Sequence, residues 1–206
     1  MSTTYSTSNS ALVLVDVLND FMAEDGKLAG MIGPMIEKHH LKKNLHRLLN
    51  GVRKAGFKTI YAPHGADEHS FDGIPHIHPR FQFGIDNKVF WIGSYGADFY
   101  EPLKPQQGDI IVGRHHMFDS FSGTGLEEQL RTNGIEKVVL AGLTLQTCIE
   151  GTGRHALEAG FHVTFLTDAV SDFTDAAHRA ALEISYPTYG HEVITIDDFL
   201  AAIDVA

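Results

Sequence analysis

The sequence predicts a three-layer α/β/α sandwich, in which helices cover both faces of a doubly wound, mostly parallel sheet of about six strands. Short runs that are apolar on both faces, as in the centre of a helix-covered sheet, recur along the chain. Segments of helical periodicity separate these runs, so strand and helix alternate in the Rossmann-like manner. No internal repeat or linker divides the 206 residues, and we expect one domain over 11–206 after a disordered or extended tail at 1–10.

The first half of the chain supplies two strands, one helix and a long irregular stretch. Residues 11–17 (Ala-Leu-Val-Leu-Val-Asp-Val) are predicted to form a buried strand whose apolar run ends at Asp16. Leucines at helical spacing predict a helix over 35–55, and residues 58–62 form a second, short strand. Between 63 and 107 five prolines interrupt regular structure, which favours long active-site loops over a linker.

The second half is more regular. Apolar runs predict strands at 109–113, 137–142, 161–166 and 192–196. Helical periodicity and end signals, such as Gly160 at a C′ position and Asp197 at an N-cap, predict helices at 125–133, 147–159, 175–185 and from 197 onward.

Composition excludes several classes of function. With 26 acidic against 16 basic residues the formal charge is −10, and no Lys/Arg run supplies a basic patch, so we expect neither nucleic-acid binding nor attraction to a membrane surface. No apolar stretch approaches the roughly 20 residues that span a bilayer, and the N-terminus lacks the charged start of a signal peptide, which predicts a cytoplasmic protein. The single cysteine excludes an intramolecular disulfide and zinc sites built from two thiolates.

Three polar residues fall beyond predicted strand ends, where parallel sheets bind ligands: Asp16, Arg114 and Cys148. At a helix start and near Arg114, the Cys148 thiol would have a lowered pKa, and Asp16 could transfer the proton. Each residue also has a purely structural alternative. Cys148 could be a small buried hydrophobic residue, Asp16 could cap a turn and Arg114 could lie on the surface.

Three segments carry a resemblance to a known family. They are 12–21 (Leu-Val-Leu-Val-Asp-Val-Leu-Asn-Asp-Phe), 108–112 (Gly-Asp-Ile-Ile-Val) and 138–148 (Val-Val-Leu-Ala-Gly-Leu-Thr-Leu-Gln-Thr-Cys), the last continuing into Thr-Gly-Arg-His-Ala at 152–156. In this order they resemble the isochorismatase-like cysteine hydrolases, which include nicotinamidases, N-carbamoylsarcosine amidohydrolase and ureidoacrylate amidohydrolases. The resemblance spans nearly the whole chain.

The resemblance implies a catalytic triad of aspartate, lysine and cysteine, with Cys148 as nucleophile and Asp16 as general base. Counted from Asp109, Arg114 stands at the lysine position; counted back from Phe121, His115 takes its place. Arginine keeps the charge but cannot give up its proton, whereas a histidine would make the site depend on pH.

The same resemblance implies a cis peptide bond between Leu143 and Thr144. This bend would let the backbone N–H groups of Thr144 and Cys148 point together as an oxyanion hole.

The nicotinamidases of the family hold a metal with an aspartate and two histidines after the second strand. Here Ala62 occupies the aspartate position and the spacing from His64 to His69 is one residue too long, while His76 and His78 form a second pair. We therefore expect no catalytic metal and no cofactor, and we disfavour nicotinamide as substrate, although these histidines leave metal binding open.

The aromatic side chains expected to line the substrate pocket are Phe21, Trp91, Tyr95, Phe118 and Phe121.

Together these observations predict a hydrolase that cleaves a small amide or ureide C–N bond through a covalent acyl-enzyme on Cys148. The alternatives are vinyl-ether hydrolysis of the isochorismate type, which needs no nucleophilic thiol, and a non-catalytic binding member of the fold. The resemblance further implies a small-molecule substrate and a homodimer or homotetramer.

Overall fold

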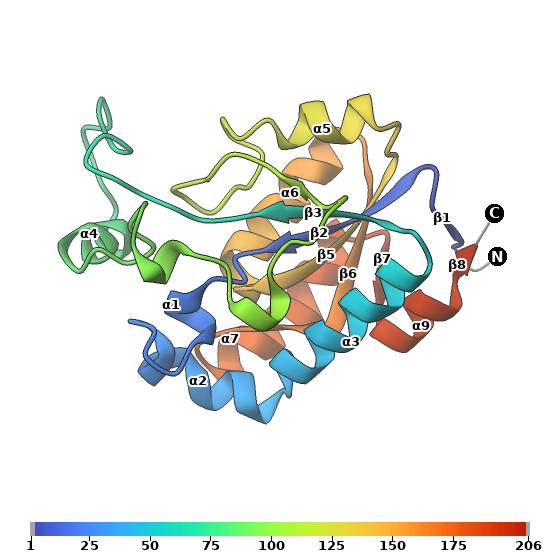
Figure 1. Cartoon of the computed structure of the whole chain (residues 1–206), viewed down its shortest axis with the longest axis horizontal. Helices are drawn as coiled ribbons and strands as arrows, with labels where there is room; N and C mark the ends of the chain where they lie inside the picture. The colour runs from blue at the N-terminus through green and yellow to red at the C-terminus, as the bar shows by residue number, and fades with distance from the viewer. Residues whose placement is uncertain (1–2, 205–206) are drawn as a thin grey trace.

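A six-stranded parallel sheet forms the centre of the computed structural model, which describes residues 3–204 (Figure 1). Its spatial order is β4-β3-β2-β5-β6-β7, and every neighbouring pair runs parallel. The strands are β2 (Ser10–Val15), β3 (Lys58–Ala62), β4 (Ile110–Ile111), β5 (Lys137–Leu143), β6 (His162–Ser171) and β7 (Glu192–Ile194). The predicted fold class and the six predicted strands are confirmed.

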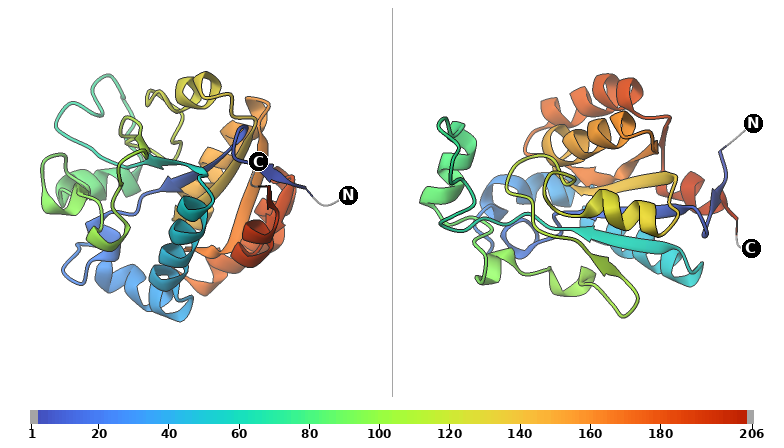
Figure 2. Two further views of the ribbon diagram at one scale, coloured as in Figure 1. Left: turned by 45° about the vertical axis from the view of Figure 1, so that its right-hand side comes forward. Right: turned by 90° about the horizontal axis from the view of Figure 1, so that it is seen from above.

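Helices cover both faces of this sheet because its central strands are apolar on both sides (Figure 2). Leu12 and Leu14 of β2 pack toward a layer made of α2 (Ala29–Lys38), α3 (Leu41–Lys54) and α9 (Ile196–Ala201). The intervening residues of β2 pack toward the opposite layer, which contains α5 (Leu126–Thr132), α6 (Glu150–Glu158) and α8 (Tyr186–Tyr189). Helix α7 (Asp175–Ala180) leads directly into Ala181, which is buried in this layer. Within residues 3–204, no helix combines the length and the apolar character needed to cross a membrane.

The helix predicted over 35–55 is wrong in its extent, because two helices occupy this region. His40 adopts a left-handed backbone conformation (φ 52°), which ends α2 and lets α3 start in a new direction. The first half of α2 escaped the periodicity argument because Gly30, Gly33 and Pro34 have the lowest helix propensities.

The first and last described strands pair with each other at the end of the molecule opposite to α4 (Figure 1). Strand β1 (Tyr5–Ser6) pairs with β8 (Ile203–Asp204), and the buried Tyr5 hydroxyl hydrogen-bonds Thr164 at 2.8 Å. The described part of the predicted tail contains β1, a turn at 7–9 and the first residue of β2; residues 1 and 2 lie outside the described residues, as do 205 and 206. The predicted N-cap at Asp197 is wrong: Thr195 caps α9, in a capping box with Asp198.

The irregular region from 63 to 107 extends beyond the carboxyl ends of β2 and β3. It contains α4 (Pro79–Asp86), which projects from this end of the molecule in Figure 1, and the short turns η1 (Tyr95–Ala97) and η2 (Glu101–Leu103). Pro79 suits the first helical position because it lacks an N–H that would be unpaired there. With α1 (Asn19–Met22), these segments enclose one edge of the sheet.

Gly142 allows β5 to approach β2 at this edge. Its φ of +119° is open only to glycine, and a Cβ there would lie 2.0 Å from the carbonyl oxygen of Val15. Asp16 follows Val15 directly and Leu143 follows Gly142, so this close approach sets the distance between the two strand ends.

Gly142→Ala should therefore destabilise the protein by about 3 kcal/mol and lower its Tm by roughly 6–12 °C, because the added methyl group collides with backbone. Thermal unfolding followed by circular dichroism measures this. Gly30→Ala is the matched control, since its Cβ would meet nothing within 4 Å, and it should leave Tm unchanged or slightly higher. Equal Tm values for the two variants would contradict the argument.

Candidate active site

Asp16 lies at the point where the chain first leaves the sheet. Strand β2 ends at Val15, and Asp16 takes a left-handed conformation (φ 55°) that aspartate tolerates better than most residues. Its carboxylate is buried, and Oδ1 accepts the backbone N–H of His64 at 2.7 Å. The chain continues from β2 to β3 on one side of β2, and β5 lies on its other side, so the strand order reverses at β2. Asp16, at the end of β2, therefore lies at the topological switch point of the sheet.

Cys148 comes from the neighbouring strand end. After β5 the Leu143–Thr144 peptide bond is cis, and the π-helical turn η3 (Leu145–Ile149) carries Cys148 into α6. Buried Asp172, just past β6, accepts the N–H of Gln146 at 2.8 Å and fixes the start of this turn. The helix thus begins two residues before the predicted position at Thr147, and Cys148 lies inside its first turn.

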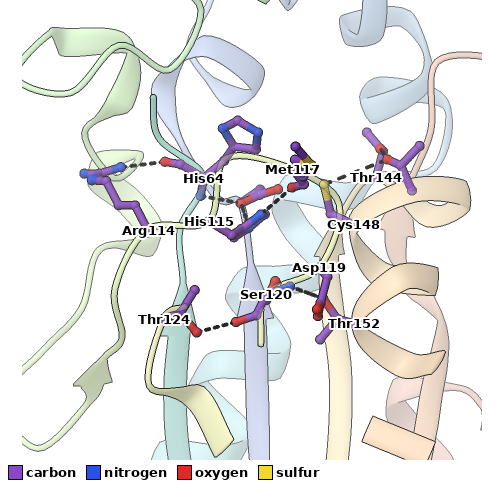
Figure 3. Close-up of polar contacts among 12 residues, drawn as sticks. His64, Arg114, His115, Met117, Asp119, Ser120, Thr124, Thr144, Cys148 and Thr152 are labelled. Carbon is purple, nitrogen blue, oxygen red and sulfur yellow. Dashed lines mark hydrogen bonds and ion pairs between the residues drawn. The ribbon is translucent and has the colours of Figure 1, made fainter. Parts of the chain in front are cut away.

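His115 completes a buried cluster with these two residues (Figure 3). Its Nδ1 donates to the carbonyl of Met117 at 2.7 Å, and its Nε2 lies 3.0 Å from Asp16 Oδ1. The imidazole nitrogen, a carboxylate oxygen and the Cys148 sulfur all lie within 4.8 Å of one another. All three residues are at most 5% exposed.

Arg114 does not join this cluster. Its guanidinium donates to the carbonyls of His64 at 2.6 Å and Ala97 at 2.9 Å, and Figure 3 shows it directed away from Cys148. Neighbouring residues of an extended segment point to opposite sides, so Arg114 and His115 cannot both face Asp16. The sequence left two ways of aligning the family's lysine position, one selecting Arg114 and the other His115. The geometry of the site agrees with the alignment that selects His115.

The segment that carries His115 is tied to the helix that carries Cys148. Thr152 of α6 donates to Ser120 Oγ at 2.9 Å, and the N–H of Ser120 donates back to Thr152 Oγ1. Thr124 in turn donates to the Ser120 carbonyl at 2.6 Å (Figure 3). These hydroxyl groups are buried, so the network fixes His115 relative to Cys148 with little freedom.

Asp16 and His115 form a carboxylate–imidazolium pair. Burial by itself would raise the pKa of Asp16, but the charge and hydrogen bond of His115 lower it overall. Burial likewise opposes the charged form of His115, yet Asp16 and the Met117 carbonyl hold its pKa above the ordinary value. His64 adds no charge, since burial and the nearby His115 lower its pKa to about 3.

The prediction of a lowered thiol pKa is wrong. Burial, followed by the charge of the adjacent Asp16, raises the pKa of Cys148 well above its ordinary value. The Thr147 hydroxyl, 3.9 Å from the sulfur, and the backbone N–H of Thr144 only partly oppose this. Arg114, which was expected to stabilise a thiolate, is engaged elsewhere, so the resting group is a thiol beside a carboxylate.

A cavity of about 390 Å³ is lined by Asp16, His64, Thr144 and Cys148, whereas His115 lies behind them and does not line it. Its walls are largely aromatic, with the side chains of Phe21, Phe71, Phe81, Phe83, Phe90, Phe118 and Phe173. Among the described residues that line it, Arg80 of α4 is the one with a permanent positive charge; its guanidinium lies over the rings of Phe118 and Phe173 at 5.8 and 5.9 Å.

Of the aromatic residues predicted to line the pocket, Phe21 and Phe118 do so. Phe121 instead stacks on His155 in the core, with ring centroids 4.5 Å apart. Trp91 lies outside the cavity under the ammonium group of Lys88, and exposed Tyr95 directs its hydroxyl to Asp25. Aromatic type alone could not separate core from pocket, because both environments select the same side chains.

Sequence reasoning missed the contribution of α4 and considered His64 only as a metal ligand. A usable signal for His64 existed, since it lies two residues past the end of β3, at the same sheet edge as Asp16. The histidines considered as a metal group do not come together: His69, His76 and His78 are exposed, whereas His64 lies beside His115 with ring centroids 5.0 Å apart.

Asp20, in the segment that resembles the family, holds a wall of the cavity. Its buried carboxylate accepts the N–H of Phe90 at 2.6 Å and that of Lys27 at 3.0 Å. It thereby ties α1 to the segment that follows α4 and fixes Phe90 against Phe21, whose ring centroid is 4.7 Å away.

Comparison with known proteins agrees with this geometry. The isochorismatase domain profile matches residues 10–198. The ureidoacrylate amidohydrolase RutB of Variovorax paradoxus is 27% identical over 204 residues, covering 94% of this chain and 81% of the relative. N-carbamoylsarcosine amidase from Thermoplasma acidophilum is 26% identical with a TM-score of 0.74, covering 92% of this chain and 97% of that structure.

A cysteine hydrolase from Pseudomonas syringae pv. phaseolicola has the same fold, with a TM-score of 0.82 at 22% identity over 98% of this chain and 95% of that structure. The family profile covers all six strands of the central sheet and the whole Asp16–His115–Cys148 cluster. The chain therefore belongs to the isochorismatase family of hydrolases.

Proposed function

We propose that this chain hydrolyses the C–N bond of an amide or ureide through an acyl thioester on Cys148, with Asp16 as the base and His115 as the cationic member of the triad. One observation carries the proposal: a thiol, a carboxylate and an imidazole lie within 4.8 Å of one another, and the thiol and the carboxylate line a cavity. Nucleophile, base and orienting group in mutual reach are what covalent catalysis requires.

In the acylation step, Asp16 takes the thiol proton as the sulfur attacks the substrate carbonyl. The raised pKa of Cys148 fits this order, because a thiol that stays protonated at rest needs a base at the moment of attack. Oδ2 of Asp16 is buried without a hydrogen-bond partner among the described residues and is free for this proton. The backbone N–H groups of Thr144 and Cys148 would receive the oxyanion.

Collapse of the intermediate breaks the C–N bond, and Asp16 returns the proton to the departing nitrogen. A water molecule then loses a proton to Asp16 and attacks the thioester, which releases the acid and restores the thiol. His115 stays protonated throughout. Its Nε2–H orients Oδ1, and its charge offsets the negative charge that moves between carboxylate, sulfur and oxyanion.

The cavity and the relatives together suggest the class of substrate. The relatives' names denote ureido and carbamoyl compounds, which supports a substrate of that kind. Walls of phenylalanine favour an apolar body attached to it, because that surface leaves water on binding. Arg80, whose guanidinium lies at the cavity wall, favours a carboxylate on the same molecule. N-carbamoyl-L-phenylalanine combines all three features and is the first probe.

Asp16→Asn should affect the two reactions of the thiol in opposite directions. It keeps a residue that tolerates the left-handed backbone but removes the charge that raises the pKa of Cys148. Alkylation by iodoacetamide near neutral pH should therefore rise about tenfold, while hydrolysis of the probe falls about 100-fold or more. Asp72→Asn, at an exposed site, is the control. Parallel losses in both reactions would argue against Asp16 as the base.

The pH profile should identify His115, not Arg114, as the triad cation. Because the pKa of Asp16 is lowered, kcat/KM should fall only at a pH below 3.8; because the pKa of His115 is raised, the alkaline limb should lie above 6.5. His115→Lys should move the alkaline limb upward toward roughly pH 10, the ordinary range of lysine. Arg114→Ala should keep the wild-type limb, and loss of that limb in Arg114→Ala would reverse the assignment.

Arg80→Ala should raise KM for N-carbamoyl-L-phenylalanine about three- to tenfold with little change in kcat, because an exposed charged contact is lost. N-phenethylurea, which lacks the carboxylate, is the matched substrate and should be nearly indifferent to this change. Arg80→Lys should recover part of the loss. Equal effects on both substrates would mean that Arg80 shapes the wall and does not read a carboxylate.

A further inference from the structure

The cluster of Asp16, His115 and Cys148 offers one sulfur, one nitrogen and one oxygen donor within 4.8 Å of one another. This mixed donor set is typical of divalent zinc. Three protein ligands with a fourth position open to a cavity correspond to an open zinc site. We propose that these residues also bind a zinc-class divalent ion, and that the bound ion holds the enzyme in an inactive form.

The distances suit such an ion with small adjustments. Zinc bonds of about 2.0 Å to nitrogen and oxygen and 2.3 Å to sulfur in a tetrahedron place the ligand atoms roughly 3.3–3.8 Å apart. His115 Nε2 and Asp16 Oδ1 are already 3.0 Å apart. The remaining separations are at most 4.8 Å, so bringing the three atoms to one ion requires movements of about 1 Å.

The surrounding contacts are those that metal ligands require. Nδ1 of His115 donates to the Met117 carbonyl at 2.7 Å, which aims Nε2 at the cluster, as the second nitrogen of a zinc-bound histidine does. Oδ1 of Asp16 accepts the N–H of His64, which orients the carboxylate. Oδ2 of Asp16 is buried and lacks a partner among the described residues, so a ligand-binding atom is left unsatisfied.

The charges balance when the ion is bound. The divalent ion replaces the proton of the Cys148 thiol and the Nε2 proton of His115, and both protons go to solvent. Thiolate, carboxylate and neutral imidazole then leave the buried site with no net charge. A lysine, which the family usually carries at the position of His115, has no lone pair while it is protonated and would repel the ion. Arg114, the nearest guanidinium in sequence, is held away by two carbonyls.

Binding at this place would block catalysis, a consequence that rests on the proposed function. The sulfur lone pair and the Asp16 carboxylate would both be engaged, so neither attack nor proton transfer could occur. The sequence led us to expect no catalytic metal, and the site proposed here is inhibitory. Binding itself rests only on the three side chains and can be measured without a substrate.

Titration of metal-free protein with Co²⁺, followed by its visible and near-ultraviolet spectrum, tests the binding. One equivalent should give a thiolate-to-metal charge-transfer band that Zn²⁺ abolishes by displacement. Cys148→Ser should lose the band, and His115→Lys should weaken binding about tenfold or more. His69→Ala, which changes an exposed histidine, should titrate as wild type. A spectrum without the thiolate band, or binding indifferent to His115, would overturn the site.

Protection of the thiol gives a readout that is independent of turnover. Zn²⁺ should slow alkylation of Cys148 by iodoacetamide in wild type and much less in His115→Lys. If the protein hydrolyses the probe, zinc should inhibit wild type at concentrations about tenfold or more below those that inhibit His115→Lys. Protection without any hydrolase activity would refute the proposed function and leave the metal site standing. Equal protection of both proteins would refute the metal site.

Discussion

The buried pair between Asp16 and His115 is the interaction on which the site depends. Both side chains are at most 1% exposed, and each holds the other in its charged form against the cost of burial. Removing one partner of such a pair leaves an unpaired charge and typically costs about 3–5 kcal/mol. The pair also joins the end of β2 to the segment before α5, so it links chemistry to the assembly of this sheet edge.

The topology brings the third member to the pair. Strands β2 and β5 are neighbours, and Val15 and Gly142 lie in register although 126 residues separate them in the sequence. Their polar successors therefore emerge together at the switch point of the sheet. The hydroxyl network between Ser120 and Thr152 then fixes the third segment against α6. No single stretch of sequence contains the site, and it exists only when the central sheet is complete.

Much of this arrangement could be predicted from the sequence because it follows from strong local signals. The continuous apolar runs located all six strands, and the residues after them located Asp16 and Cys148 at one edge. The predictions that the structure contradicts concern features set by local geometry or by tertiary packing. Nothing in the residue types distinguishes Arg114 from His115, since a shift of one residue in an extended segment reverses which side chain faces inward. The left-handed His40 and the stacking of Phe121 on His155 are set by packing in the same way.

The sequence predicts a lowered pKa for the Cys148 thiol, whereas the structure raises it. The reason lies in how Cys148, Asp16 and His115 are arranged. A helix start predicts a stabilised thiolate only where water or a cation shares the charge, and here the sulfur is buried beside a carboxylate. The imidazolium that could compensate is bonded to that carboxylate first. The positive charge of His115 therefore lowers the pKa of Asp16 and does not stabilise a thiolate on Cys148. The same buried surroundings that keep Cys148 protonated strengthen the charge interaction between Asp16 and His115, because the local dielectric is low.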